Sequence, residues 1–167
     1  MRIRALLGRS TELSILLALI SVGALAQRGT SAEELQSDPT GMYSFQRDGE
    51  FVQITLDEWH TPKPQETFSV TGYISRYGDE SSDKDQFLDQ FFSKGSLRGS
   101  HLEFTTKQVH GTWYEFKGEL KRGPAKSRTD EGYYLLTGTL TESRVKERKT
   151  SARQREITMK MFPDEEQ

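Results

Sequence analysis

The stretch HLEFTTKQVHGTWYEFKGELKR, residues 101–122, alternates apolar and polar side chains on either side of a glycine-containing break. Leu102 and Phe104 alternate with polar neighbours before the break, and Tyr114 and Phe116 do so after it. Period-two alternation on both sides of such a break predicts an antiparallel hairpin with one buried face and one solvent-facing face.

The second arm of this hairpin has a pattern that occurs twice more in the chain. Its order is apolar, x, apolar, x, Gly, x, apolar, and it is found at residues 68–74, 114–120 and 134–140. Three strands of one design predict a small curled sheet or barrel. We interpret the shared glycines, at positions 72, 118 and 138, as points where strands bend; space for a ligand is the alternative.

The chain as a whole predicts an all-β fold with one short helix. The expected strands are residues 41–46, 50–57, 67–77, 96–99, 101–109, 112–122, 132–142 and 154–162. Because eight is an even count, the last strand runs antiparallel to the first and can close the sheet. Closure removes exposed strand edges, so we expect an eight-stranded up-and-down antiparallel barrel. The charged run 143–153 has no period and predicts a mobile loop.

A change of period predicts the helix. Large apolar side chains at i, i+1, i+4 and i+5 define one helical stripe, formed by Phe87, Leu88, Phe91 and Phe92. Asp83 with Gln86 makes a capping box, and Gly95 is a suitable C-terminal stop. Such a stripe needs an apolar surface to cover, and the open end of the barrel supplies one.

In architecture the chain resembles the calycins, the lipocalin and avidin group of small secreted barrels, over residues 40–162. Gly41-Met42-Tyr43 stands where a lipocalin-like chain opens with Gly-x-Trp, with Tyr in place of Trp. The literal Gly111-Thr112-Trp113 lies in the middle of the chain instead. Arg153 or Arg155 matches the arginine that such chains place near the last strand. The resemblance carries an expected fold, and no family function comes with it.

The first 26 residues have the pattern of a secretory signal peptide. Arginines precede the apolar run Leu13–Ala26, and Ala24-Leu25-Ala26 predicts cleavage after Ala26. The run is shorter than the roughly 20 residues that span a bilayer, with an uncleaved membrane anchor as the alternative. We therefore expect an exported protein that has no stable membrane span after cleavage.

The mature chain is expected to have three parts. These are a flexible arm at residues 27–39, a β-barrel domain at 40–163 and a short tail at 164–167. The chain contains no cysteine, whereas small secreted eukaryotic domains usually depend on disulfides. A bacterial periplasm or the bacterial exterior is therefore the expected compartment.

Composition and motifs narrow the function classes. The formal net charge is −2, which argues against a nucleic-acid binder driven by bulk charge. The lack of cysteine excludes thiol catalysis and thiolate metal sites. The sequence has no Gly-x-Ser-x-Gly elbow and no phosphate loop, so we expect no cofactor and no enzyme activity, and an enzyme of unknown class is only the third hypothesis.

Polar residues on the buried side of the strands give the best candidate site. The alternation places Arg76, His110 and Glu142 inward near strand ends that share one mouth of the barrel, together with Tyr114. The predicted helix would cover this mouth with Phe87, Phe91 and Phe92. A charged cluster under an apolar cover is either a ligand-binding site or a salt-bridge plug that satisfies itself.

A calcium site is a weaker hypothesis. The oxygen-bearing side chains of Asp79, Ser81, Asp83 and Asp85 are spaced like the start of a calcium loop. Lys84 occupies the position that needs glycine, and Gln90 stands where a bidentate glutamate belongs. Helix capping and a solvated acidic loop explain the same residues, and the three histidines have no metal-binding spacing.

Two function hypotheses follow. In the first, an exported barrel binds a small amphipathic or anionic molecule at the helix-covered mouth. In the second, a filled barrel acts as a structural or protein-interaction module through outward aromatic residues, namely Phe51, Tyr73, Trp113 and Tyr133. The basic run 144–155 could contact lipid head groups or a polyanion, with a solvated loop as the alternative.

Overall fold

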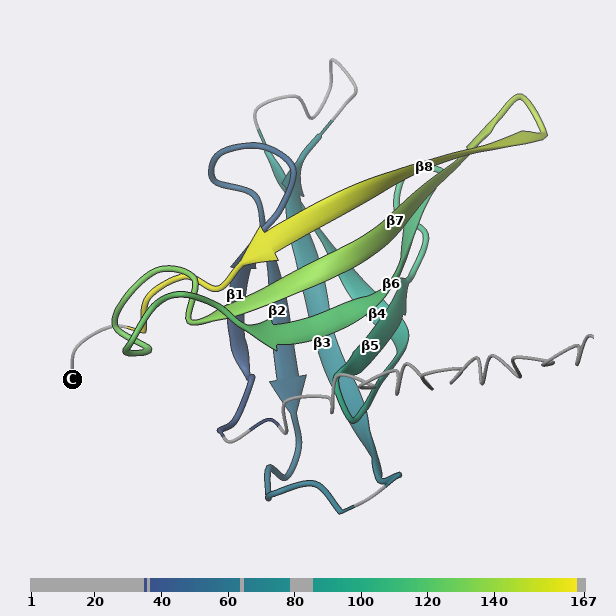
Figure 1. Cartoon of the computed structure of the whole chain (residues 1–167). Coiled ribbons are helices and arrows are strands. Elements are labelled where there is room, and N and C mark those ends of the chain that lie inside the picture. The colour runs from purple at the N-terminus through teal and green to yellow at the C-terminus, as the bar shows by residue number, and fades with distance from the viewer. Residues whose placement is uncertain (1–34, 36, 64, 79–85, 165–167) are drawn as a thin grey trace, which may run out of the picture.

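The computed structural model describes residues 35, 37–63, 65–78 and 86–164, which form a single strongly curled antiparallel sheet (Figure 1). The strands pair in sequence order, each antiparallel to the next. They are β1 (Gly41–Ser44), β2 (Phe51–Leu56), β3 (Thr67–Tyr77), β4 (Phe87–Arg98), β5 (His101–Thr106), β6 (Thr112–Arg122), β7 (Tyr134–Lys146) and β8 (Lys149–Lys160). The predicted eight-stranded up-and-down order is therefore confirmed.

The core lies on the concave face of this sheet. Alternate residues of the strands turn inward, as the period-two pattern requires. The largest fully buried side chains are Tyr43, Tyr134, Phe104, Phe116, Ile54, Ile74, Leu97, Leu102, Leu120, Leu136, Leu140 and Met159. Phe92 stacks on Phe104 at 4.3 Å between ring centroids, and Phe104 stacks on Phe116 at 5.4 Å, so aromatic rings fill the interior across three neighbouring strands.

The predicted helix around Phe87–Gly95 is wrong, because this segment belongs to β4. A spacing of four residues repeats on one face of a helix, but it also repeats on one face of a strand. Phe87 and Phe91 point outward and are exposed, whereas Phe92 turns into the core. An irregularity between Phe92 and Lys94 then changes the register, which concealed the period of two.

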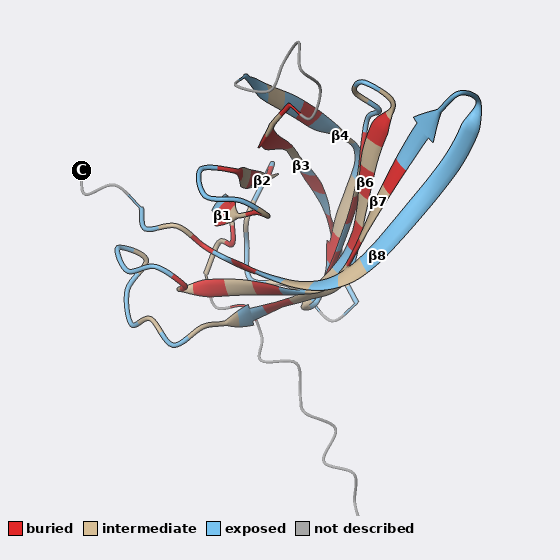
Figure 2. Cartoon of the chain, turned by 90° about the horizontal axis from the view of Figure 1, so that it is seen from above, coloured by how far each residue is buried: buried red, intermediate tan, exposed pale blue. Residues whose placement is uncertain are grey.

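The expected mobile loop at residues 143–153 is also wrong. β7 and β8 continue to pair as far as Lys146 and Lys149 and are joined by a two-residue turn. The turn residues Glu147 and Arg148 both have positive φ, as a tight hairpin turn of the mirror-image type requires. Beyond Arg144, where the pairing of β7 with β6 ends, this hairpin projects from the sheet as two strands, and residues 144–154 are exposed (Figures 1 and 2). We call residues 142–155 the ribbon.

The sheet closes at one corner and stays open elsewhere. The strands therefore form a curled half-barrel and not the closed barrel that was expected. β1 meets the chain just after β8 through a bridge between Tyr43 and Met161, next to a hydrogen bond from the Phe162 N–H to the Met42 carbonyl. β1 is four residues long and β8 is twelve. Most of the outer edge of β8 therefore faces a gap, which we call the seam.

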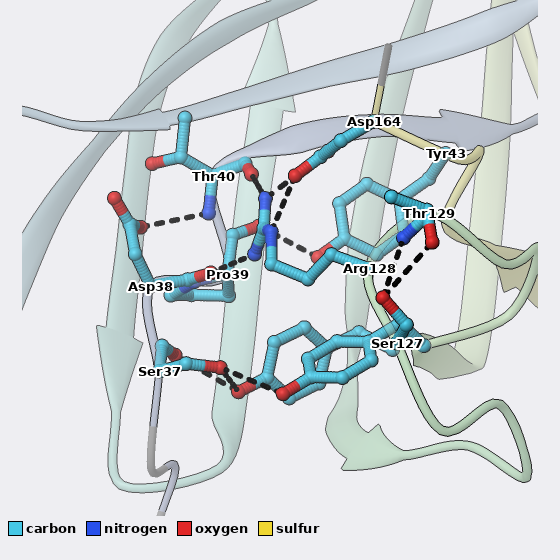
Figure 3. Close-up of polar contacts among 11 residues, drawn as sticks. Ser37, Asp38, Pro39, Thr40, Tyr43, Ser127, Arg128, Thr129 and Asp164 are labelled. Atoms are coloured by element: carbon cyan, nitrogen blue, oxygen red, sulfur yellow. Dashed lines mark hydrogen bonds and ion pairs between the residues drawn. The ribbon is translucent and has the colours of Figure 1, made fainter. Parts of the chain in front are cut away.

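Arg128 holds the closed corner together (Figure 3). Its guanidinium donates hydrogen bonds to the carbonyl oxygens of Asp38 and Thr40 just before β1, and it pairs with the Asp164 carboxylate beyond β8. The Tyr43 hydroxyl, buried in the same corner, donates to the Pro39 carbonyl at 2.7 Å. These bonds join the two ends of the sheet at this corner.

The last residues before β1 have defined contacts. Leu35 is buried in the core, and the Ser37 hydroxyl lies 2.8 Å from the Tyr134 hydroxyl. The predicted signal segment, the Ala26 cleavage position and the start of the arm lie outside the described residues. In the part of the chain that the structure describes, no helix is long and apolar enough to cross a membrane.

The inward glycines mark places where strands approach closely. Gly118 on β6 lies directly opposite Gly138 on β7. A Cβ atom at Gly118 would stand 2.4 Å from the Thr137 carbonyl oxygen and 2.8 Å from the Gly138 Cα. The position has no free space, which favours the interpretation of strand packing over that of a ligand cavity.

The glycine contact gives the first prediction. Gly118→Val should lower the free energy of unfolding by about 1–3 kcal/mol, because the added side chain overpacks the contact between β6 and β7. Urea unfolding followed by circular dichroism measures the change. Lys117→Ala, an exposed neighbour on β6, should stay within about 0.5 kcal/mol of the parent. Equal stability of the Gly118→Val variant and the parent would mean that the wall has room at this point.

The second prediction concerns alkaline pH. Burial raises the pKa of the Tyr43 hydroxyl above its usual range, so the folded protein keeps it neutral. The unfolded chain ionises this group near about pH 10, so the stabilisation is complete below that pH and falls above it, by up to about 1.4 kcal/mol per pH unit. Tyr43→Phe should cost about 1 kcal/mol at neutral pH through the lost hydrogen bond.

The Tyr43→Phe variant should also lose stability less steeply above pH 10 than the parent does. Urea unfolding at a series of alkaline pH values measures both slopes. Identical slopes in the two proteins would show that Tyr43 does not keep its proton in the fold.

Candidate functional site

A pocket of about 600 Å³ occupies the seam. One wall comes from the turn between β1 and β2, the floor from the ends of β3 and β6, and the other wall from the ribbon. The lining consists of Gln46, Arg47, Glu50, Arg76, Tyr114, Glu142, Arg144, Ser151, Ala152, Arg153 and Arg155. Five arginines and two glutamates give this lining a formal charge of +3, although the whole chain is slightly acidic.

The first wall is built around a buried carboxylate. Glu50 is 1 % exposed and accepts hydrogen bonds from the Arg47 guanidinium at 2.7 Å, from the Arg47 backbone N–H at 3.1 Å and from the Tyr77 N–H at 3.0 Å. The Arg47 guanidinium also donates to the Tyr77 carbonyl. A buried carboxylate with this many donors holds its arginine in one position at the edge of the pocket.

The floor contains a buried guanidinium. Arg76 is 2 % exposed, and its Nε donates to the Gln90 amide oxygen at 2.7 Å while Nη1 donates to the Tyr77 carbonyl at 3.0 Å. Gln90, itself fully buried, donates in turn to the Thr112 carbonyl at 2.9 Å. The Arg76 guanidinium also lies 5.8 Å from the centroid of the Tyr114 ring, close enough for a cation–π contact.

The second wall is the concave face of the ribbon. Glu142 on β7 pairs with the Arg144 side chain, and its other oxygen lies 3.6 Å from Arg155 Nη2. Arg153 lies directly opposite Glu142 on β8, and Arg155 lies opposite the buried Leu140. One carboxylate is therefore surrounded by three arginines from two strands.

Two donors in this region make no hydrogen bond to a described residue, although one of them, Arg155 Nη2, lies 3.6 Å from a Glu142 carboxylate oxygen. Gln46 Nε2 and Arg155 Nη2 are both buried, and among the described residues neither makes a hydrogen bond. Burying a polar group without a hydrogen bond costs roughly 1–3 kcal/mol, so such groups are uncommon in folded proteins. Both groups are N–H donors, and both belong to residues that line the pocket. An acceptor within hydrogen-bond distance of either group would satisfy it.

This chemistry suits an anion. Guanidinium groups donate in pairs to carboxylate, phosphate or sulfate oxygens, and the amide of Gln46 adds a neutral donor. Within the described residues, no group of three or more histidine, aspartate or glutamate side chains is arranged to hold a metal ion.

Three of the predicted site residues meet in the pocket, namely Arg76, Tyr114 and Glu142. His110 does not line it. The sequence predicts a strand as far as residue 109, but β5 ends at Thr106. His110 is therefore an exposed turn residue with positive φ and not an inward strand residue. The predicted cover is wrong as well, because Phe87 and Phe91 lie on the outer face and Phe92 packs inside the core.

The weaker calcium hypothesis cannot be compared with the structure. Asp79, Ser81, Asp83 and Asp85 all lie in the segment 79–85, outside the described residues. That segment stays a prediction from spacing alone.

Sequence reasoning missed most of the arginine lining. Arg144 and Arg153 were assigned to a loop and Arg155 to the start of the last strand, and no side was given to any of them. The signal was present, because counting back by twos from the apolar Met161, Met159 and Ile157 gives Arg155 and Arg153. Arg47 and Gln46 follow β1 in a turn, where alternation gives no direction.

A second surface feature lies on the outer face of β2, β3 and β4. Phe51 contacts Tyr73 at 5.8 Å between ring centroids, and Tyr73 contacts Phe91 at 5.4 Å. Phe87 packs on Tyr77 at 4.4 Å. We call these five residues the aromatic stripe.

Comparisons with known proteins assign no family to this chain. No family model matches the chain, and neither the curated proteins nor the solved structures that were searched gave a match. The candidate site therefore stands on its own geometry.

Proposed function

We propose that this protein binds a small anionic molecule in the seam pocket. The ligand would place a carboxylate, phosphate or sulfate group among Arg155, Arg76 and Gln46. The protein would act as a binding protein, since the pocket lining is rich in N–H donors. Export through the N-terminal signal segment, and the resemblance to the calycins, remain parts of this proposal.

One observation carries the proposal. Two buried N–H donors, Gln46 Nε2 and Arg155 Nη2, lack hydrogen bonds and belong to residues of one pocket whose lining has an excess of three positive charges. Anionic oxygens within hydrogen-bond distance of these groups would remove the cost of leaving them unsatisfied and reduce the repulsion between the arginines.

The filled interior supports an anionic ligand over an apolar one. Rings from β4, β5 and β6 stack where a fatty ligand would have to enter, and Gly118 packs directly against Gly138 beside them. Specificity would then come from charge and hydrogen bonds at the seam, and an attached apolar group would face solvent.

A second candidate is a protein-interaction module that uses the aromatic stripe. Phe87 and Phe91 are 49 % and 55 % exposed, which is unusual for phenylalanine and often marks a contact surface. Anion titration separates the two candidates, since an interaction module of this kind has no need of an occupied seam.

The third prediction tests the pocket. Isothermal titration of the protein with orthophosphate at low ionic strength should show saturable binding, and Arg155→Gln should weaken it by roughly 10–100-fold, because a hydrogen bond to a charged group is worth about 1.5–3 kcal/mol. Arg98→Gln makes the same change of charge outside the pocket and should leave the affinity within about twofold of the parent.

Thermal unfolding of each variant without ligand checks that the fold is kept. Bound anion should also raise the melting temperature of the parent, because only the folded protein binds it. Failure of orthophosphate, sulfate and acetate alike to bind the parent protein would contradict the proposed function.

A further inference from the structure

The ribbon carries its charge on one face. Buried Leu140 identifies the concave side of β7, and Met159 identifies that of β8. Counting by twos from these residues toward the turn, the same face carries Arg144, Lys146, Lys149, Arg153 and Arg155, with Glu142 as the one acidic residue.

The opposite face of the ribbon has a different composition. Its residues near the turn are uncharged, namely Ser143, Val145, Thr150 and Gln154, together with Ala152, which also borders the pocket. The two remaining charged residues, Glu147 and Arg148, form the turn itself. The concave face therefore carries most of the ribbon's positive charge, interrupted by Ser151 and Glu142, and it begins at the pocket.

Two contacts between like charges support a role for this face. Lys146 lies directly opposite Lys149, and Arg144 is the diagonal neighbour of Arg153 across the same pair of strands. Like charges directly opposite each other destabilise a pair of strands. An anion that bridges them would remove this cost.

The basic face is longer than a single anionic group. Six residues separate Arg155 from Lys149, a distance of about 20 Å at about 3.3 Å per residue. The face is two strands wide, so it suits one extended chain of charges and not a broad surface. At its base the chain would enter the pocket between Arg155 on one side and Arg47 on the other.

We propose that the ligand of the seam is a linear anion with several charged groups. One phosphate or sulfate group occupies the pocket, and at least one more lies on the basic face between Arg153, Lys149 and Lys146. The inference rests on the proposed anion site and extends it, because it specifies the valence and shape of the ligand.

Calorimetric titration of the purified protein with orthophosphate and with a linear polyphosphate long enough to reach from Arg155 to Lys149 tests the proposal. The long polyphosphate should bind more tightly than orthophosphate. The double variant Lys146→Gln/Lys149→Gln should lose about tenfold in polyphosphate affinity, as expected for two exposed charge pairs, and should keep its orthophosphate affinity. A sulfated oligosaccharide titrated in parallel distinguishes phosphate from sulfate as the charged group.

The matched control is Arg148→Gln/Lys160→Gln. It removes two positive charges from the same hairpin, one in the turn and one on the opposite face, and should leave both affinities within about twofold. Equal loss in the two double variants would show that only net charge matters and would overturn the inference. Orthophosphate binding with no gain for the long polyphosphate would overturn it too, while the proposed anion site in the pocket would stand. If no anion binds, the proposed function of the pocket is refuted as well.

Discussion

The structure depends on an unequal pairing between its first and last strands. β8 pairs with β7 over its whole length, but the end of the chain meets β1 only near Tyr43 and Met161. A strand of four residues cannot cover the edge of a strand of twelve. The sheet therefore curls and closes at one corner, where Arg128 joins both ends, and leaves the seam along the rest of β8.

An open edge of this length is a hazard, because unpaired backbone groups invite other strands to add. Lys149, Arg153, Arg155 and Lys160 place charges along this edge, which discourages such pairing. The same charges would attract anions into the seam. Glu50 and Glu142 pair with neighbouring guanidinium groups, and the pocket lining keeps a formal charge of +3. The open edge of β8 thus underlies both its charged side chains and the proposed binding.

Alternation along the sequence predicted most of the sheet, because one buried face imposes a period of two. The bounds of β3 and β6 were obtained this way, as was the meeting of Arg76, Tyr114 and Glu142 in one pocket. Alternation gave wrong predictions where the period was ambiguous or where a strand had already ended. A spacing of four in β4 fits helix and strand alike. His110 lies in the turn after β5, and the many charged residues of the ribbon concealed its regular alternation. Gln46 and Arg47 became part of the site only through the curl of the sheet, which no local pattern encodes.

Hydrogen exchange along β8 tests the open seam most directly. The Met161 N–H bonds to Tyr134 of β7, whereas the N–H groups of Lys160 and Phe162 bond toward β1. Even-numbered amides between positions 150 and 158 should therefore face the seam and exchange fast, while odd-numbered amides should be protected by β7. NMR exchange rates that alternate in this way support the seam. Equal protection of both sets would mean that the barrel is closed and that no such pocket exists.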